Sequence, residues 1–131
     1  LLIDGEHQIL WTGVGELFVF GTVKRLDADT LARRIGDAGF MTDLSDGWIA
    51  LELDGPDAQT RLDLITLPNL SDASFAVGDV TSTILCHIRV LIWRKSTTGF
   101  VLLSTASTGR SLTQRLRHEL TLLDSLAEFA R

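Results

Sequence analysis

Apolar and polar residues alternate in several short segments, the pattern of half-buried β-strands. Gln8–Thr12 and Glu16–Phe20 are apolar runs joined by Gly13-Val14-Gly15, and glycine tolerates the positive φ of a tight turn. These runs predict a β-hairpin. Trp48–Leu53 predicts a further strand that points Ile49, Leu51 and Leu53 to one face. Trp48 lies on the other, mixed face.

Three segments have the three-to-four-residue apolar spacing of amphipathic helices. The first follows an acidic cap at Leu26–Thr30 and is expected to end at Gly39. In the second, Pro56 suits the first turn and the apolar positions begin at Ala58. The third is predicted over Ser111–Arg131, with Gly109 as a flexible approach and Thr108 or Ser111 as the cap.

An irregular crossing is predicted between the second helix and the next strands. Residues 68–79 are rich in Ser, Asp, Asn and Gly, and Phe75 and Val77 are its expected apolar anchors. From Val80 to Arg94 the chain is rich in β-branched residues, and Phe100–Leu103 follows a polar turn as the hairpin partner. We expect these to be central strands.

Together these elements predict an α+β fold, in which a mixed or antiparallel sheet is covered by about three helices. The 131 residues suit a single domain spanning 1–131, because chains usually divide only beyond about 250 residues. Hydrophobic residues make up 45% of the chain, which excludes disorder through low hydrophobicity.

Charge and cysteine content narrow the class of protein. The net charge of −5 argues against nucleic-acid binding, which relies on Lys and Arg. One cysteine, Cys86, cannot form an internal disulfide, so we expect a cytoplasmic protein in which this thiol packs in an apolar strand. Since no apolar run approaches the roughly 20 residues that cross a bilayer, we expect no membrane partner.

Metal binding and nucleophilic catalysis both lack their usual residue patterns. The three histidines, His7, His87 and His118, show no ligand spacing, and Cys86 and His87 would point to opposite faces of one strand. We expect His87 to be a hydrogen-bonded, partly buried side chain. No Gly-x-Ser-x-Gly elbow occurs, and Gly13-Val14-Gly15 lacks the third glycine of a dinucleotide fingerprint. We therefore predict no catalytic, cofactor-binding or metal-binding residue.

Charged and aromatic residues in the strands are candidates for an interface. Asp54 and Asp57 flank the start of the second helix, where a capping role explains both carboxylates. Arg89 and Arg94 interrupt apolar sequence, so each either contacts another chain or forms an internal ion pair, and the pattern leaves both open. Trp48 and Trp93 complete the set of possible interface residues.

The order of several segments resembles the gamma subunit of heterotetrameric sarcosine oxidase. The segments are Trp11–Leu17, Asp43-Leu44-Ser45, Leu53-Asp54-Gly55-Pro56-Asp57-Ala58, Gly78-Asp79-Val80-Thr81, Val90–Arg94 and Gly99–Leu103. The resemblance runs from about Ile9 to Leu120. It implies a fold of the folate-binding, aminomethyltransferase-like group.

For function, the resemblance implies a noncatalytic assembly subunit of a bacterial complex in one-carbon metabolism. That complex converts sarcosine to glycine, formaldehyde and hydrogen peroxide, and FAD, FMN, NAD and tetrahydrofolate belong to the other subunits. Two alternatives stay open at this point. One is a free-standing folate-binding, aminomethyltransferase-like protein, and the other is an orphan α+β interaction domain.

Overall fold

The computed structural model describes residues 2–3, 7–21 and 27–129, with the backbone alone for 2–3 and 126–129. The chain divides into two compact units, Leu1–Asp46 and Gly47–Arg131. We describe each unit by itself. That the whole of 1–131 acts as one gamma-like domain stays a prediction.

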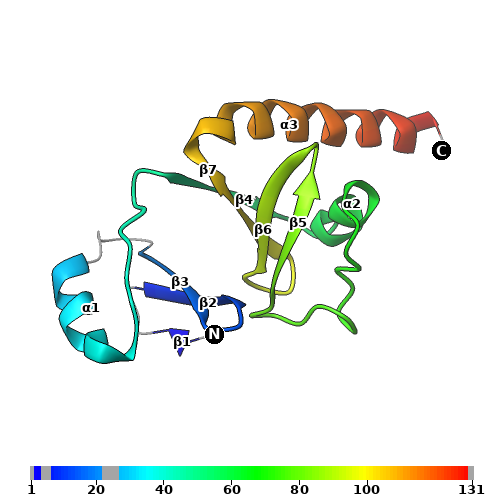
Figure 1. Cartoon of the computed structure of the whole chain (residues 1–131). Coiled ribbons are helices and arrows are strands. Elements are labelled where there is room, and N and C mark those ends of the chain that lie inside the picture. The colour runs from blue at the N-terminus through cyan, green and yellow to red at the C-terminus, as the bar shows by residue number, and fades with distance from the viewer. Residues whose placement is uncertain (1, 4–6, 22–26, 130–131) are drawn as a thin grey trace. The chain divides into compact units, whose positions relative to one another are not determined.

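In the first unit, the described residues form a three-stranded antiparallel sheet and a short helix (Figure 1). The strands are β1 (Leu2–Ile3), β2 (His7–Gly13) and β3 (Glu16–Gly21), in the order β1-β2-β3. The predicted hairpin of β2 and β3 is therefore confirmed. It turns at Gly15, whose φ of 73° is a left-handed conformation that glycine adopts readily.

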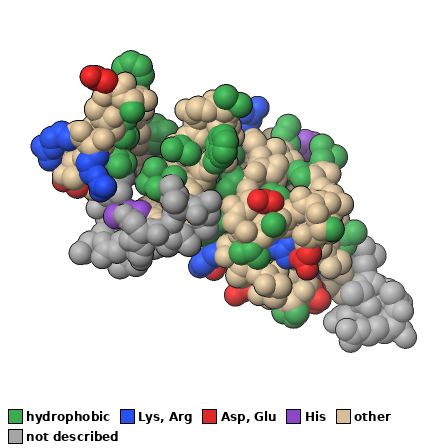
Figure 2. All heavy atoms as spheres, turned by 90° about the horizontal axis from the view of Figure 1, so that it is seen from below, with side chains coloured by type: hydrophobic (Ala, Val, Ile, Leu, Met, Phe, Trp, Pro, Cys, Tyr) green, Lys and Arg blue, Asp and Glu red, His purple; other side chains and the backbone are tan. Residues whose placement is uncertain are grey.

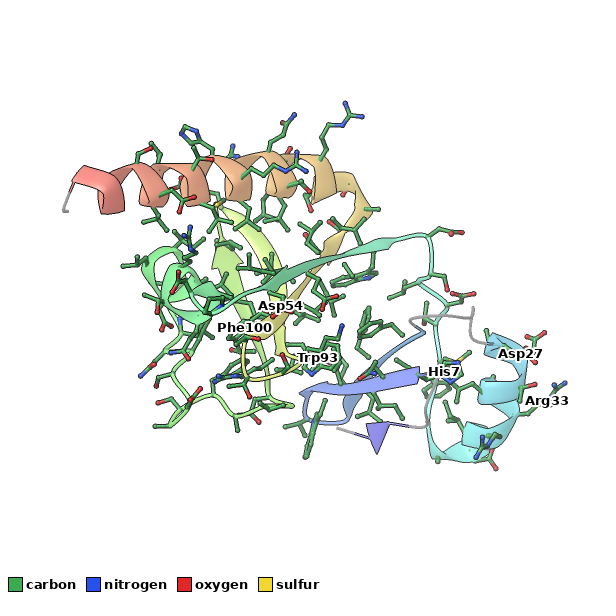
Figure 3. All side chains as sticks on the ribbon, turned by 180° about the vertical axis from the view of Figure 1, so that it is seen from behind. His7, Asp27, Arg33, Asp54, Trp93 and Phe100 are labelled. Atoms are coloured by element: carbon green, nitrogen blue, oxygen red, sulfur yellow. The ribbon has the colours of Figure 1, made fainter. Side chains whose placement is uncertain are left out.

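Helix α1 (Ala28–Ile35) begins at the predicted acidic cap. Asp27 accepts the backbone N–H of Thr30, 3.3 Å away, and its carboxylate also accepts the Thr30 hydroxyl. These hydrogen bonds lower the pKa of Asp27, which is labelled in Figure 3. The α-helix ends earlier than expected, because Gly36 takes a φ of 52° and the 3-10 turn η1 (Gly36–Ala38) follows.

In the second unit, the described residues form a four-stranded antiparallel sheet with two helices. The strands are β4 (Trp48–Asp54), β5 (Val80–Leu85), β6 (Ile88–Arg94) and β7 (Gly99–Thr105). Their order in the sheet is β4-β7-β6-β5, so β5 is an edge strand and not a central one. The helices are α2 (Ala58–Ile65) and α3 (Ala106–Phe129). The α+β class with antiparallel sheets is confirmed.

One face of this sheet carries the core of the second unit. The two helices of the second unit contribute buried leucines, Leu62 from α2 and Leu112 from α3. These pack with strand residues such as Ile92. Leu70 and Phe75 from the crossing between α2 and β5 join the same cluster, so the expected anchor role of Phe75 is confirmed. Val77 is 55% exposed, so the same prediction for Val77 is wrong.

Helix α3 begins five residues before the predicted start, and Gly109 lies inside it. A Cβ on Gly109 would lie 2.5 Å from Cδ1 of Ile49 in β4. A side chain at this position would have to displace the end of the Ile49 side chain, and glycine avoids this overlap without breaking the helix. Thr108 lies inside α3 and therefore is not the N-terminal cap that the sequence predicts. Its hydroxyl instead donates to the carbonyl of Thr105 at 3.0 Å.

The link between β5 and β6 also differs from the prediction. Cys86 and His87 form a two-residue turn and do not continue a strand. Both have positive φ, 52° and 65°, the combination of a type I′ hairpin turn. Such turns usually contain Asn or Gly, and neither residue is present to signal it in the sequence. His87 is exposed, so the prediction that its side chain is partly buried is wrong.

Candidate functional site

The four predicted interface residues lie in different environments in the second unit. Arg89 on β6 is exposed and Trp48 on β4 is half-buried. Trp93 and Arg94 at the end of β6 are only 2% and 1% exposed. An interface role stays a prediction for this set, and Arg89 and Trp48 are its members with accessible surface.

Arg94 is held by contacts within its own chain. Its guanidinium donates hydrogen bonds to four backbone carbonyls, those of Leu70 (3.4 Å), Phe75 (2.7 Å), Ser96 (3.4 Å) and Thr97 (2.9 Å). It also forms an ion pair with Asp72 and lies 5.3 Å from the ring centroid of Phe100 (Phe100 is labelled in Figure 3). Of the two alternatives left by the sequence, the internal ion pair therefore describes Arg94.

Two of the carboxylates near α2, Glu52 and Asp54, have structural partners. Asp54 accepts the hydroxyl of Thr98 at 2.8 Å, and Glu52 pairs with Lys95 at 2.7 Å. Asp57 is at the cap position of α2, but its side chain makes no capping hydrogen bond, so the capping prediction for Asp57 is wrong. The preceding chain enters the helix through Gly55 and Pro56, and the N–H of Ala58 donates to the carbonyl of Gly55 at 3.1 Å.

A cleft of about 330 Å³ lies between the β5–β6 turn and α3. It is lined by Cys86, His87, Gln114, Arg115, His118 and Glu119. Arg115 fixes the turn by donating to the carbonyl of Cys86 at 3.1 Å. Burial and the nearby Glu119 charge raise the pKa of the Cys86 thiol against the opposing effect of Arg115. This thiol stays protonated near pH 7 and is a poor nucleophile.

Two kinds of feature are absent from the described residues: a cluster of metal ligands and a membrane-spanning helix. No three His, Cys, Asp or Glu side chains in this part of the chain come together as metal ligands. Within the same residues, none of the helices combines the length and apolar character that a bilayer crossing requires.

Apolar side chains exposed on the β2–β3 hairpin were not predicted from the sequence. Trp11 and Leu17 are cross-strand partners and are 70% and 64% exposed, and Val14 in the turn is fully exposed. We call these three residues the hairpin surface. Leu10, on the opposite face of β2, is 1% exposed. Hydrophobic side chains on one exposed face of the molecule are shown in green in Figure 2. Alternation predicts two faces, and it does not tell which apolar face stays uncovered.

The chain is similar to two curated proteins named sarcosine oxidase subunit gamma. The protein from Corynebacterium sp. (strain P-1) is 32% identical over 123 residues, which cover 93% of this chain and 58% of that protein. The protein from Corynebacterium sp. (strain U-96) is 30% identical over 123 residues, which cover 93% and 57%. The resemblance to the sarcosine oxidase gamma family is confirmed.

The fold comparison points to the same family. A chain of heterotetrameric sarcosine oxidase from Corynebacterium sp. U-96, solved in complex with pyrrole 2-carboxylate, matches with a TM-score of 0.79 and 26% identity. The match covers 88% of this gamma-like chain and 60% of the solved one. No protein-family model matches the chain. The gamma-like chain thus spans less than two thirds of the relatives that it matches.

Proposed function

We propose that this chain is a structural, noncatalytic subunit of a heteromeric sarcosine oxidase. The observation that carries the proposal is the similarity to sarcosine oxidase gamma subunits along 93% of the chain, together with the matching fold. In this proposal the complex converts sarcosine to glycine, formaldehyde and hydrogen peroxide. FAD, FMN, NAD and tetrahydrofolate bind to the partner subunits, and the complex is cytoplasmic.

The hairpin surface supports an assembly role. The hairpin exposes three apolar side chains, those of Trp11, Val14 and Leu17. Exposed apolar surface of this kind is typical of sites that contact another protein. Trp is also among the residues that contribute most to binding at interfaces. We propose that a partner subunit covers this surface. Trp48 and Arg89 are further candidates for the contact.

The proposal is tested by purifying the affinity-tagged chain from its native host. We expect the other subunits to co-purify, and the eluate to form hydrogen peroxide when sarcosine is added. The chain expressed alone should show no such activity. Absence of the tagged chain from every sarcosine-oxidising fraction would refute the proposal, and so would sarcosine turnover by the chain alone.

A matched pair of variants tests the hairpin surface. Leu17→Asp replaces a side chain that is 64% exposed in the isolated chain, and Leu64→Asp does the same at 65% exposure on α2. Burying a leucine contributes about 1.5–3 kcal/mol, so Leu17→Asp should weaken co-purification at least about tenfold. Leu64→Asp should leave it near wild type. Equal effects of the two variants would show that the hairpin surface is not the specific contact.

A further inference from the structure

The outer edge of β5 has a row of backbone groups with no hydrogen-bonding strand beside it. The two-residue turn makes Leu85 and Ile88 a hydrogen-bonded pair, and alternate residues along β5 then face β6. The hydrogen bond from the N–H of Arg94 to the carbonyl of Asp79, at 3.0 Å, fits this alternation. The N–H and C=O groups of Val80, Ser82 and Ile84 therefore point away from β6.

In the part of the chain that the structure describes, β6 is the strand that pairs with β5. Unpaired edges are commonly protected by Lys, Pro or other charged side chains, and Val80–Leu85 contains none of these. The opposite edge strand, β4, carries Glu52 and Asp54. The large apolar side chain of Ile84, beside this edge, is also 59% exposed. This edge has the features of a site that accepts another strand.

The order of side chains in β5 identifies the strand that fits. Val80, Ser82 and Ile84 read apolar, serine, apolar in both directions, and Thr81 and Thr83 lie symmetrically around Ser82. An antiparallel copy centred on Ser82 places Val80 opposite Ile84, serine opposite serine, and threonine opposite threonine. Apolar pairs and Thr–Thr pairs of this kind stabilise antiparallel strands.

We propose that β5 pairs with β5 of a second copy of this chain, around a two-fold axis that passes beside Ser82. The pairing forms about six backbone hydrogen bonds, two for each of the three hydrogen-bonded pairs that involve Val80, Ser82 and Ile84. It also covers Ile84 with Val80 of the second copy, and it brings no like charges together within the paired segment. The contact is isologous, as closed dimers require. It uses none of the residues of the hairpin surface.

Disulfide trapping tests both the pairing and its register, in a Cys86→Ser background so that the native thiol does not react. Facing residues of a hydrogen-bonded antiparallel pair have Cα atoms about 5.5 Å apart, within the usual range for a disulfide. Ser82→Cys should therefore form a covalent dimer under mild oxidation. Val80→Cys alone should not, because its two copies would lie about 13 Å apart, four residues along the strands.

A mixture of Val80→Cys and Ile84→Cys chains should form the covalent heterodimer, because these positions face each other in the proposed register. Cross-linking that is equally efficient for Val80→Cys alone would overturn the register. Failure of Ser82→Cys to cross-link in a chain that remains folded by circular dichroism would overturn the pairing.

Light scattering after gel filtration measures the dimer without cross-linking. We expect a dimer at micromolar concentration that Ser82→Lys converts to monomer, because two ammonium groups would face each other at the axis. Ser111→Lys, at an exposed position of α3, should remain dimeric. A chain that is monomeric throughout would overturn the proposal, and so would a dimer unaffected by Ser82→Lys. If Ser82→Cys instead cross-links in its host to another polypeptide, the occupant is a partner's strand and the second copy is excluded.

Discussion

Arg94 offers a direct test of what stabilises the second unit. Its side chain is 2% exposed, and its two nearest carbonyl acceptors are those of Phe75 (2.7 Å) and Thr97 (2.9 Å). A hydrogen bond to a charged group contributes about 1.5–3 kcal/mol, and a buried acceptor left without a donor is costly. Arg94→Met keeps the side-chain length and removes every donor. We expect it to lower the free energy of unfolding by about 3–5 kcal/mol.

Two further variants separate hydrogen bonding from charge. Arg94→Lys keeps the charge but loses the planar fork that reaches several carbonyls, so we expect about half the loss, roughly 2 kcal/mol. Asp72 is 75% exposed, and solvent screens its pairing with Arg94. Asp72→Ala should therefore cost less than about 1 kcal/mol.

The assay is equilibrium unfolding in urea, followed by tryptophan fluorescence and by far-ultraviolet circular dichroism. The two probes must agree for the free energies to be comparable. Wild-type stability is expected within about 5–15 kcal/mol, so a loss of 3–5 kcal/mol is measurable. Arg94→Met within about 1 kcal/mol of wild type would refute the reasoning. An Asp72→Ala variant as unstable as Arg94→Met would show that the ion pair dominates and the carbonyl contacts do not.

Three other predictions follow from local geometry. Gly109→Leu should lower the free energy of unfolding by about 1–3 kcal/mol in urea, because any Cβ there overlaps Ile49. His87→Gly should raise the unfolding free energy by about 1 kcal/mol in a thermal melt, because glycine adopts its φ of 65° without strain. The pKa of Asp27 is lowered in the folded chain, so its stabilisation of α1 is present above the unfolded pKa of about 3.9 and is lost as pH falls through the lower folded value. The amide chemical shift of Thr30, followed by NMR from pH 6 to pH 2, should therefore move only below about pH 4.

Elements with strong local signals could be predicted from the sequence. Alternation located β4, and the glycines located the β2–β3 hairpin. The β5–β6 turn was missed because Cys86 and His87 carry none of the usual turn signals. The start of α3 was misplaced because Gly109 resembles a helix break, whereas its reason is the close approach of Ile49. That contact depends on tertiary structure, which local propensity does not contain.

For the interface candidates too, some features could be predicted from local sequence and others depend on tertiary contacts. The sequence indicated that Arg94 needs a compensating group, and this holds because a buried guanidinium without partners is too costly. It could not identify Asp72, since the two lie 22 residues apart across an irregular crossing. The hairpin surface was equally hidden, because Trp11 and Leu10 are neighbouring apolar residues and only the folded hairpin distinguishes the exposed one from the buried one.

In this chain, the best guide to function is the set of residues that the fold itself does not require. Arg94 is explained by hydrogen bonds that the fold would lose without it, and Gly109 by the close approach of Ile49. Trp11, Val14 and Leu17 are largely exposed, so polar residues in their place would leave the hairpin hydrogen bonds intact and reduce exposed apolar area. The uncharged edge of β5 is similar, since a lysine at Ser82 would protect the edge without disturbing the core. In both places the sequence keeps a feature that is unfavourable for an isolated chain, and the proposed contact with another chain would remove that disadvantage.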